Sequence, residues 1–175
     1  MDTFPELTTE RCRLRQIRPS DQAAVFQGLS HPEVIPYYGV SFSTFEETAE
    51  QMRWYADLEA NQTGIWWAIC DRHDGTFFGA GGFNGWDHTH RKAEIGFWLL
   101  PVAWGRGLMQ EVMPEICRYG FDRMQLHRIE GFVESENVRC KNAMAKLPFH
   151  HEGTMRDCEM KNGKWISVDI YALVH

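Results

Sequence analysis

A junction between an apolar run and a helical pattern, over residues 99–111, constrains the fold of this chain more than any other feature. The run reaches Leu100 and then narrows to Gly105-Arg106-Gly107. Beyond Gly107, apolar residues recur at spacings of three and four to about Asp122, which predicts a helix. A strand that turns through glycines into a helix presents free backbone N–H groups and the positive end of the helix dipole, where phosphates bind. A short glycine motif is also compatible with an ordinary strand–helix connection.

Length and composition bound the class of protein. A chain of 175 residues, 43% hydrophobic and 24% charged, predicts a single domain over residues 1–175. The net charge of −6 does not favour nonspecific binding to nucleic acid. The five cysteines are odd in number and include no Cys-x-x-Cys pair, which argues against a disulfide framework and a zinc–thiolate site.

The sequence pattern also bears on the compartment. No apolar stretch approaches the length of a membrane span. Residues 1–6 have neither the basic region nor the apolar region of a signal peptide. We therefore expect a reduced, cytoplasmic protein that has no membrane partner.

Alternation and helical periodicity predict the element order β-α-α-β-β-β-α-β-α-β-β. The predicted strands cover residues 11–17, 65–70, 77–83, 93–100, 128–133, 152–159 and 165–173. The predicted helices begin at 19–21, at Ser43 or Thr44, at 108 and at 136–137. Three consecutive strands imply an antiparallel meander, and the βαβ unit after them implies a parallel pair. The expected fold is α+β, with a mixed, mostly antiparallel seven-stranded sheet flanked by helices.

Three local features carry more specific expectations. Gly79 and Gly82 within one predicted strand suggest a bulge or a close backbone approach. The aromatic loop 34–42, which contains Tyr37-Tyr38-Gly39, fits a pocket lining and an ordinary surface loop equally well. His88-Thr89-His90 has the spacing of a metal-ligand pair, but no third ligand of suitable spacing is nearby, so we expect loop histidines and no metal site.

Six short motifs occur in a specific order and spacing along nearly the whole chain. They are Leu7-Thr8-Thr9-Glu10-Arg11-Cys12-Arg13-Leu14-Arg15, Ala93-Glu94-Ile95-Gly96-Phe97-Trp98-Leu99, Trp104-Gly105-Arg106-Gly107, Glu134-Ser135-Glu136-Asn137, Lys146-Leu147-Pro148-Phe149 and Asn162-Gly163-Lys164-Trp165. Together they make the chain resemble the GNAT superfamily of acetyl-CoA-dependent N-acetyltransferases, and within it the branch that modifies ribosomal-protein N-termini. The resemblance implies a GNAT-like sheet whose central parallel strands splay apart to hold CoA.

The resemblance also implies how acetyl-CoA is bound as a co-substrate. Backbone groups of Trp98, Leu99 and Leu100 would pair with the pantetheine arm like an added strand, and Asn137 would hydrogen-bond to the arm. Met109 departs from the family pattern, which expects glycine or alanine, and its Cβ could crowd the phosphates. The pyrophosphate would be held by the backbone amides of Gly105, Arg106, Gly107, Leu108, Met109 and Gln110.

Cys140 stands where the family pattern Asn-x-x-Ser has its serine, near the thioester sulfur. Three roles are open for it. It could protonate the departing CoA thiolate, because the two thiols have similar pKa values. It could be a small substitute for serine that only packs, with water as the acid. It could also accept the acyl group as a nucleophile.

An amine substrate is protonated at neutral pH, so attack on a thioester needs a base. Glu159 matches a glutamate proposed as the base in the resembling branch, and Glu94 opens the central strand, where related acetyltransferases often place a water-linked base. Both glutamates could instead form surface ion pairs, Glu159 with Arg156 or Lys161 and Glu94 with Arg91 or Lys92. We rank Glu159 before Glu94, and expect backbone N–H groups near Leu99 to stabilise the oxyanion.

The sequence therefore predicts an N-acetyltransferase in which an amine attacks acetyl-CoA directly in a ternary complex. The acceptor is either a protein N-terminal amine, such as that of a ribosomal protein, or a small amine such as a polyamine, amino acid or antibiotic. A CoA-binding sensor without turnover is the alternative from another class. The acidic residues Glu33, Glu46, Glu47 and Glu50 could attract a basic acceptor, and a homodimer is open.

Overall fold

Eight strands form one mixed sheet in the part of the chain that the computed structural model describes, residues 4–175. The strands are β1 (Leu7–Thr8), β2 (Cys12–Gln16), β3 (Ile65–Asp71), β4 (Phe77–Asp87), β5 (Lys92–Leu99), β6 (Arg128–Glu134), β7 (His150–Lys161) and β8 (Lys164–Val174). Their order in the sheet is β1-β2-β3-β4-β5-β6-β8-β7, and only β5 and β6 pair in parallel. The predicted α+β class and mostly antiparallel sheet are confirmed.

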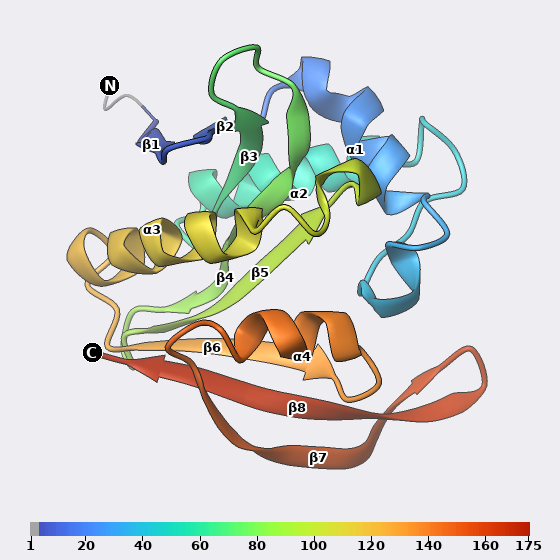
Figure 1. Ribbon diagram of the computed structural model, residues 1–175, viewed down its shortest axis with the longest axis vertical. Coiled ribbons are helices and arrows are strands. Elements are labelled where there is room, and N and C mark those ends of the chain that lie inside the picture. Colours follow the sequence, from blue (N-terminus) through green and yellow to red (C-terminus); the bar gives the residue numbers. More distant parts are fainter. Residues whose placement is uncertain (1–3) are drawn as a thin grey trace.

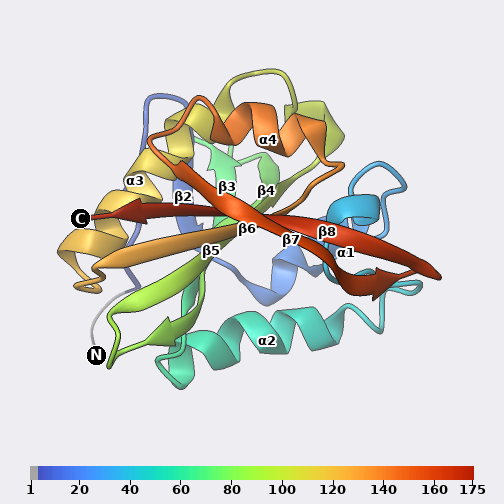
Figure 2. The same ribbon diagram turned by 90° about the horizontal axis from the view of Figure 1, so that it is seen from below.

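Helices cover both faces of this sheet. The helices are α1 (Gln22–Leu29), α2 (Ala49–Ala60), α3 (Leu108–Asp122) and α4 (Val138–Met144), with 3₁₀ turns at Pro19–Asp21, Ile35–Tyr37 and Pro101–Ala103. Figures 1 and 2 show α3 and α4 on one face and α1 and α2 on the other. No helix within residues 4–175 is long and apolar enough to cross a membrane.

Two details differ from the sequence-based expectation. The eighth strand is β1, whose two residues pair with Arg13 and Leu14 of β2 and are too few to give an alternation pattern. Helix α2 begins at Ala49, not directly after Ser43 or Thr44. The carboxylate of Glu47 accepts the Ser43 N–H at 2.9 Å, and the following residues form i→i+3 bonds, so a tight turn precedes the helix.

The buried side chains form two cores, one on each face of the sheet. The larger packs β-strand residues such as Trp67, Phe83 and Ile129 against Ile116 of α3 and Met144 of α4. The smaller packs Val25 and Leu29 of α1 and Tyr55 of α2 against the other face, with Trp98. The strands between them are buried on both faces, as the continuous apolar runs predict.

The glycines of β4 allow the close approach that the sequence suggested. A Cβ on Gly82 would lie 2.1 Å from the carbonyl oxygen of Ile65 on β3. The β3–β4 register also shifts between Ile69 and Cys70, next to Gly79. Both predicted features, a bulge and a close approach, are therefore present in this strand.

Strands β5 and β6 pair over a short stretch only. Lys92–Glu94 lies opposite Arg128–Glu130, and beyond these residues the two strands have no further paired positions. On their other edges both strands remain paired: β5 pairs with β4 as far as Leu99, and β6 pairs with β8 as far as Glu134. The sheet is therefore divided into two halves that separate at their centre, as expected from the resemblance.

Candidate active site

A cleft of about 980 Å³ lies where β5 and β6 separate. Its walls come from the loop after α1, from β5, from the glycine turn with the start of α3, from β6 and from α4. Of the residues singled out from the sequence, the lining includes Glu94, Trp98, Leu99, Gly105, Gly107, Leu108, Met109, Gln110, Asn137 and Cys140. Leu100, Arg106 and Glu159 do not line it.

One end of the cleft is formed by the glycine turn before α3. Gly105 and Gly107 have φ angles of +71° and +72°, a backbone conformation that side chains disfavour. Gly107 is the N-cap of α3 and offers no side chain to cap it, and the first helical bond runs from Glu111 N–H to Gly107 at 3.3 Å. The N–H groups of residues 108–110 therefore have no helical acceptor, and they form an anion-binding end.

Met109 does not obstruct this end. Its side chain is 8% exposed and packs in the larger core, together with Ile69, Phe97 and Val112. The side chain is thus held by apolar neighbours, and only the backbone of the turn needs to meet a ligand. This removes the physical objection to methionine where the family pattern expects glycine or alanine.

The edge of β5 offers less free backbone than expected. The Leu100 N–H donates to the Phe78 carbonyl at 2.7 Å, and Leu100 is buried. The indole N–H of Trp104 donates to the Leu99 carbonyl at 2.9 Å. Leu100 therefore has no free N–H for an added strand, and any such pairing is left to the backbone of Trp98 and Leu99.

Glu94 and Tyr38 both line the cleft. Burial raises the pKa of Glu94, a hydrogen bond from Asn84 lowers it, and the charges of Glu130 and Glu159 raise it further. Burial, with the neighbouring Tyr55 and Glu94, raises the pKa of Tyr38 well above its usual range. The aromatic loop after α1 thus lines the pocket, one of the two alternatives that the sequence left open.

Glu159 lies on the exposed part of β7, opposite Ile166 of β8, and outside the cleft lining. It forms no ion pair with Arg156 or Lys161 within the described residues 4–175. Lys161 instead donates to the Pro36 carbonyl at 2.6 Å and pairs with the carboxylate of Glu134. The charge of Glu159 contributes to the raised pKa of Glu94.

Asn137 and Cys140 begin helix α4 on the opposite wall. The Asn137 Oδ1 accepts the Cys140 N–H at 3.0 Å, so Asn137 is the N-cap of this helix. Cys140 is half-buried, and burial raises the pKa of its thiol to about 11. The thiol is therefore protonated at neutral pH, a state that can donate a proton and that is a poor nucleophile.

A buried carboxylate that sequence reasoning missed supports this wall. Asp169 of β8 is 3% exposed and pairs with Lys141 of α4 at 2.8 Å. It also accepts hydrogen bonds from Ser135 at 3.0 Å and Thr154 at 2.6 Å. Burial raises the pKa of Asp169, but these bonds outweigh it and hold the pKa far below its ordinary value. Asp169 thus ties α4 to β6 and β7.

The lining of the cleft carries charges of both signs. Glu33, Glu94, Glu134 and Glu136 line it, and the carboxylate of Glu134 is paired with Lys161. Arg139 and Lys146 also line it, and the guanidinium of Arg139 lies 4.0 Å from the centre of the Trp104 ring. The cleft can therefore contact both anionic and cationic groups of its ligands.

The histidine pair shows no metal-site geometry. The His88 Nε2 lies 2.9 Å from the Gln62 carbonyl, and its ring packs on Trp86. Within residues 4–175, His, Cys, Asp and Glu side chains form no group of three or more that could hold a metal ion.

The family model described as "Acetyltransferase (GNAT) domain" matches residues 11–150. The "uncharacterized N-acetyltransferase YoaA" of Bacillus subtilis is 33% identical over 172 residues, which cover 98% of this chain and 97% of that protein.

Two solved structures share the fold. The Salmonella typhimurium acetyltransferase that modifies the N-terminal serine of ribosomal protein L7/L12 has a TM-score of 0.87 at 20% identity, over 95% of this chain and 96% of that one. The Vibrio cholerae spermidine N-acetyltransferase in complex with CoA and spermine has a TM-score of 0.83 at 19% identity, over 94% of this chain and 95% of that one.

Proposed function

The chain belongs to the GNAT family of N-acetyltransferases, and from this membership we propose that it acetylates a cationic amine by direct attack on acetyl-CoA within the cleft between β5 and β6. One observation carries the proposal. A single cleft joins the free N-terminus of α3, which suits phosphates, to the half-buried carboxylate of Glu94, which suits a base. The family uses acetyl-CoA as its donor. The reaction therefore requires a site for the phosphates of the donor and a base for the amine, and the cleft offers both.

The donor is assigned to the wall formed by β5, the glycine turn and α4. The N–H groups of Leu108, Met109 and Gln110, with the turn at Gly105 and Gly107, would hold the pyrophosphate. The pantetheine arm would follow the backbone of Trp98 and Leu99 toward Asn137 and Cys140. Arg106 and Leu100, which do not line the cleft, are assigned no direct contact.

We assign the base to Glu94 and not to Glu159. Glu94 lines the cleft, and burial raises its pKa toward the working pH, which suits a general base. Glu159 is exposed and lies outside the lining. The order of the two glutamates is therefore the reverse of the one that the sequence suggested.

The chemical steps follow from these positions. Glu94, directly or through a water, takes a proton from the ammonium, and the free amine attacks the thioester carbon. The carbon–sulfur bond then breaks as the tetrahedral intermediate collapses, and the nitrogen loses its second proton to solvent. The CoA thiolate takes a proton from solvent or from Cys140, which solvent then reprotonates. Because its pKa is raised to about 11, Cys140 is a weaker acid than an ordinary thiol and is the less favoured donor. The high pKa of Cys140 supports this direct attack over a covalent acyl-cysteine, because a protonated thiol does not attack.

The acceptor is proposed to be the N-terminal amine of a protein. The relative that modifies an N-terminal serine supports it, as do the exposed apolar side chains beside the cleft, on the β7–β8 hairpin, which offer a surface to a polypeptide. Those side chains are Met155, Met160 and Trp165. A polyamine is the second candidate, because Glu33, Glu94 and Glu134 line the cleft and a relative binds spermine.

The release of CoA thiol tests the proposal. Wild-type protein with acetyl-CoA would be assayed against peptides with free N-terminal Ser or Ala, against the same peptides blocked at the N-terminus, and against spermidine and spermine. We expect turnover with the free peptides only. Turnover with polyamines alone would select the second candidate, and CoA binding without turnover on any amine would indicate a sensor.

A further inference from the structure

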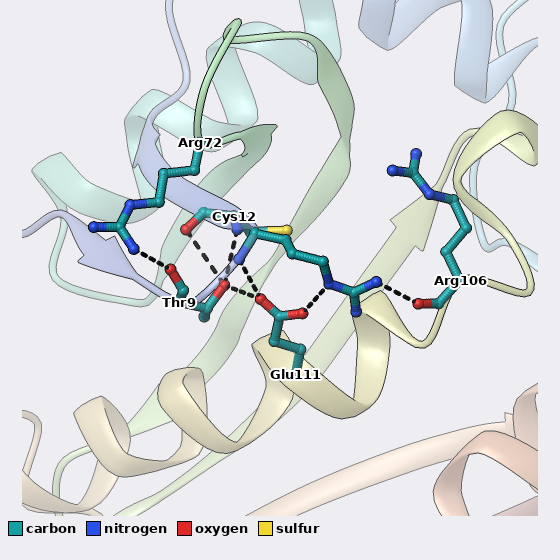
Figure 3. Close-up of polar contacts among 6 residues, drawn as sticks. Thr9, Cys12, Arg72, Arg106 and Glu111 are labelled. Carbon is teal, nitrogen blue, oxygen red and sulfur yellow. Dashed lines mark hydrogen bonds and ion pairs between the residues drawn. The ribbon is translucent and has the colours of Figure 1, made fainter.

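A network from the turn between β1 and β2 meets the first turn of α3 beside the glycine turn (Figure 3). The Glu111 Oε1 accepts the Thr9 hydroxyl at 2.5 Å and the Arg11 backbone N–H at 2.7 Å. The Glu111 Oε2 accepts the Arg11 Nε–H at 2.6 Å. Arg11 and Glu111 are 100 positions apart in sequence, so the fold brings together two segments that share no local pattern.

The same guanidinium also contacts the glycine turn itself. The Arg11 Nη1–H donates to the Arg106 carbonyl at 2.8 Å. The Arg11 Nη2 lies 3.8 Å from the position that a Cβ on Gly107 would occupy. One side chain therefore bridges the first turn of α3 and the loop that precedes it.

This bridge bears on where the N–H groups of the turn point. In a trans peptide, the carbonyl of one residue and the N–H of the next point in opposite directions. The Arg106 carbonyl is held toward Arg11, and Arg106 does not line the cleft, whereas Gly107 does. Because the Arg106 carbonyl is held away from the cleft, the Gly107 N–H of the same peptide points toward the cleft.

The bridge also offsets the negative charge of Glu111 at the N-terminus of α3. An acidic residue in the first turn stabilises a helix, but at this helix it would repel a phosphate bound at the same end. Burial raises the pKa of Glu111, and the hydrogen bonds from Thr9 and Arg11 outweigh it and keep the carboxylate ionised. The guanidinium of Arg11 lies directly against that carboxylate and compensates its charge.

We propose that Arg11 is a positioning residue for the donor's pyrophosphate: it fixes the Arg106–Gly107 peptide and neutralises Glu111 at the N-terminus of α3. The inference rests on the proposed function, because it takes the glycine turn as the phosphate site. Arg11 itself does not line the cleft. Its effect is therefore on the orientation of backbone N–H groups and on the charge around them.

The test compares two donors that differ in the nucleotide end. Acetyl-CoA carries the pyrophosphate with the phosphorylated adenosine, and S-acetyl-pantetheine has the same thioester and arm without them. The ratio of kcat/KM for acetyl-CoA to kcat/KM for S-acetyl-pantetheine isolates the contribution of the phosphate end. A general loss of structure lowers both rates and leaves the ratio unchanged.

We expect Arg11→Met to lower this ratio about tenfold, equivalent to about 1.4 kcal/mol. We also expect it to raise the Kd of CoA by the same factor in calorimetric titration. Arg13→Met is the matched control, because Arg13 lies on the adjacent strand and pairs with Glu6 on the exposed surface. The control should keep the wild-type ratio and the wild-type Kd.

The outcomes separate the two proposals. A wild-type protein that does not prefer acetyl-CoA over S-acetyl-pantetheine would overturn the phosphate site itself. A wild-type preference that Arg11→Met leaves intact would overturn the role of Arg11 alone. If Arg11→Met does not fold, Arg11→Gln keeps a polar side chain and gives the same readout, since its amide cannot reach both partners as the guanidinium fork does.

Discussion

Asn84 lies directly opposite Glu94 across the β4–β5 ladder, where its side chain lowers the pKa of the Glu94 carboxylate while burial raises it. Burial and the charges of Glu130 and Glu159 outweigh the effect of Asn84, so the pKa of Glu94 is raised on balance. A general base is most effective when its pKa lies near the working pH, so the upward shift suits Glu94 to accept a proton from an ammonium.

Glu94→Gln should lower kcat at pH 7 about 100-fold, the size of effect that general-base catalysis commonly supplies. Part of the rate should return at high pH, where more of the amine is already deprotonated. The rate of wild-type protein should fall as pH drops through the raised pKa of Glu94. Thiol release across a pH series measures both the recovery of rate in Glu94→Gln at high pH and the fall of the wild-type rate at low pH. Glu159→Gln is the matched control, and a larger loss there than in Glu94→Gln would return the base to Glu159.

Gly107→Ala should weaken CoA binding about tenfold by calorimetry, because its Cβ enters the turn that is assigned to the phosphates. The positive φ also costs about 1 kcal/mol of folding free energy. Gly75→Ala is the control, since Gly75 has a φ of +77°, has nothing within 4 Å of its Cβ position, and lies in the β3–β4 turn. Gly75→Ala should lose a similar amount of stability and keep the wild-type Kd for CoA. Equal Kd values for CoA in Gly75→Ala and Gly107→Ala would argue against the phosphate assignment.

Cys140 should react slowly with iodoacetamide at pH 8, because burial raises its pKa to about 11. The exposed Cys158 is an internal reference and should be modified first. Saturating CoA should slow the labelling of Cys140 further and leave Cys158 unchanged, as measured by mass spectrometry of the two peptides. Labelling of Cys140 that is insensitive to CoA would place the thioester elsewhere.

Asp169→Asn should lower the free energy of unfolding by about 2 kcal/mol at pH 7, because the buried hydrogen bonds from Ser135 and Thr154 lose their charged acceptor. The folded-state pKa of Asp169 is depressed, so its contribution is present above the unfolded pKa and is lost as pH falls below about 4. Urea denaturation at pH 7 and pH 3 should therefore show a difference between variant and wild type that narrows in acid. Asp57→Asn, at an exposed position of α2, should change little; a gap that stays constant with pH would contradict this account.

The sequence predicted the order of the long elements and the glycine turn because both depend on neighbouring residues. The strand ending at Leu99 and the helix from Leu108 were correctly bounded by apolar periodicity and by the glycines between them. The sequence did not predict strand β1, because it depends on a two-residue pairing. It also did not predict the late start of α2 at Ala49, which depends on bonds within a turn.

The candidate site was less predictable where it depends on register or on distant contacts. The β7–β8 register shifts between Met155 and Glu159, and such a shift changes which side of a strand a residue occupies. No alternation pattern could place Glu159 from sequence. The roles of Asp169 and Arg11 were not predicted for another reason: the residues that bind them come from other elements of the fold.

The separation of β5 from β6 also bears on how such a protein evolves. The hydrogen bonds within each half of the sheet are made by the backbone, and they tolerate exchange of side chains. The width between the halves depends on side chains, such as Ile95 on β5 and Met144 on α4, which both lie against Gly131 of β6. A lineage can therefore reshape the acceptor space through a few substitutions while both ladders persist, so one ancestral scaffold can diversify toward unlike amines without passing through unfolded intermediates.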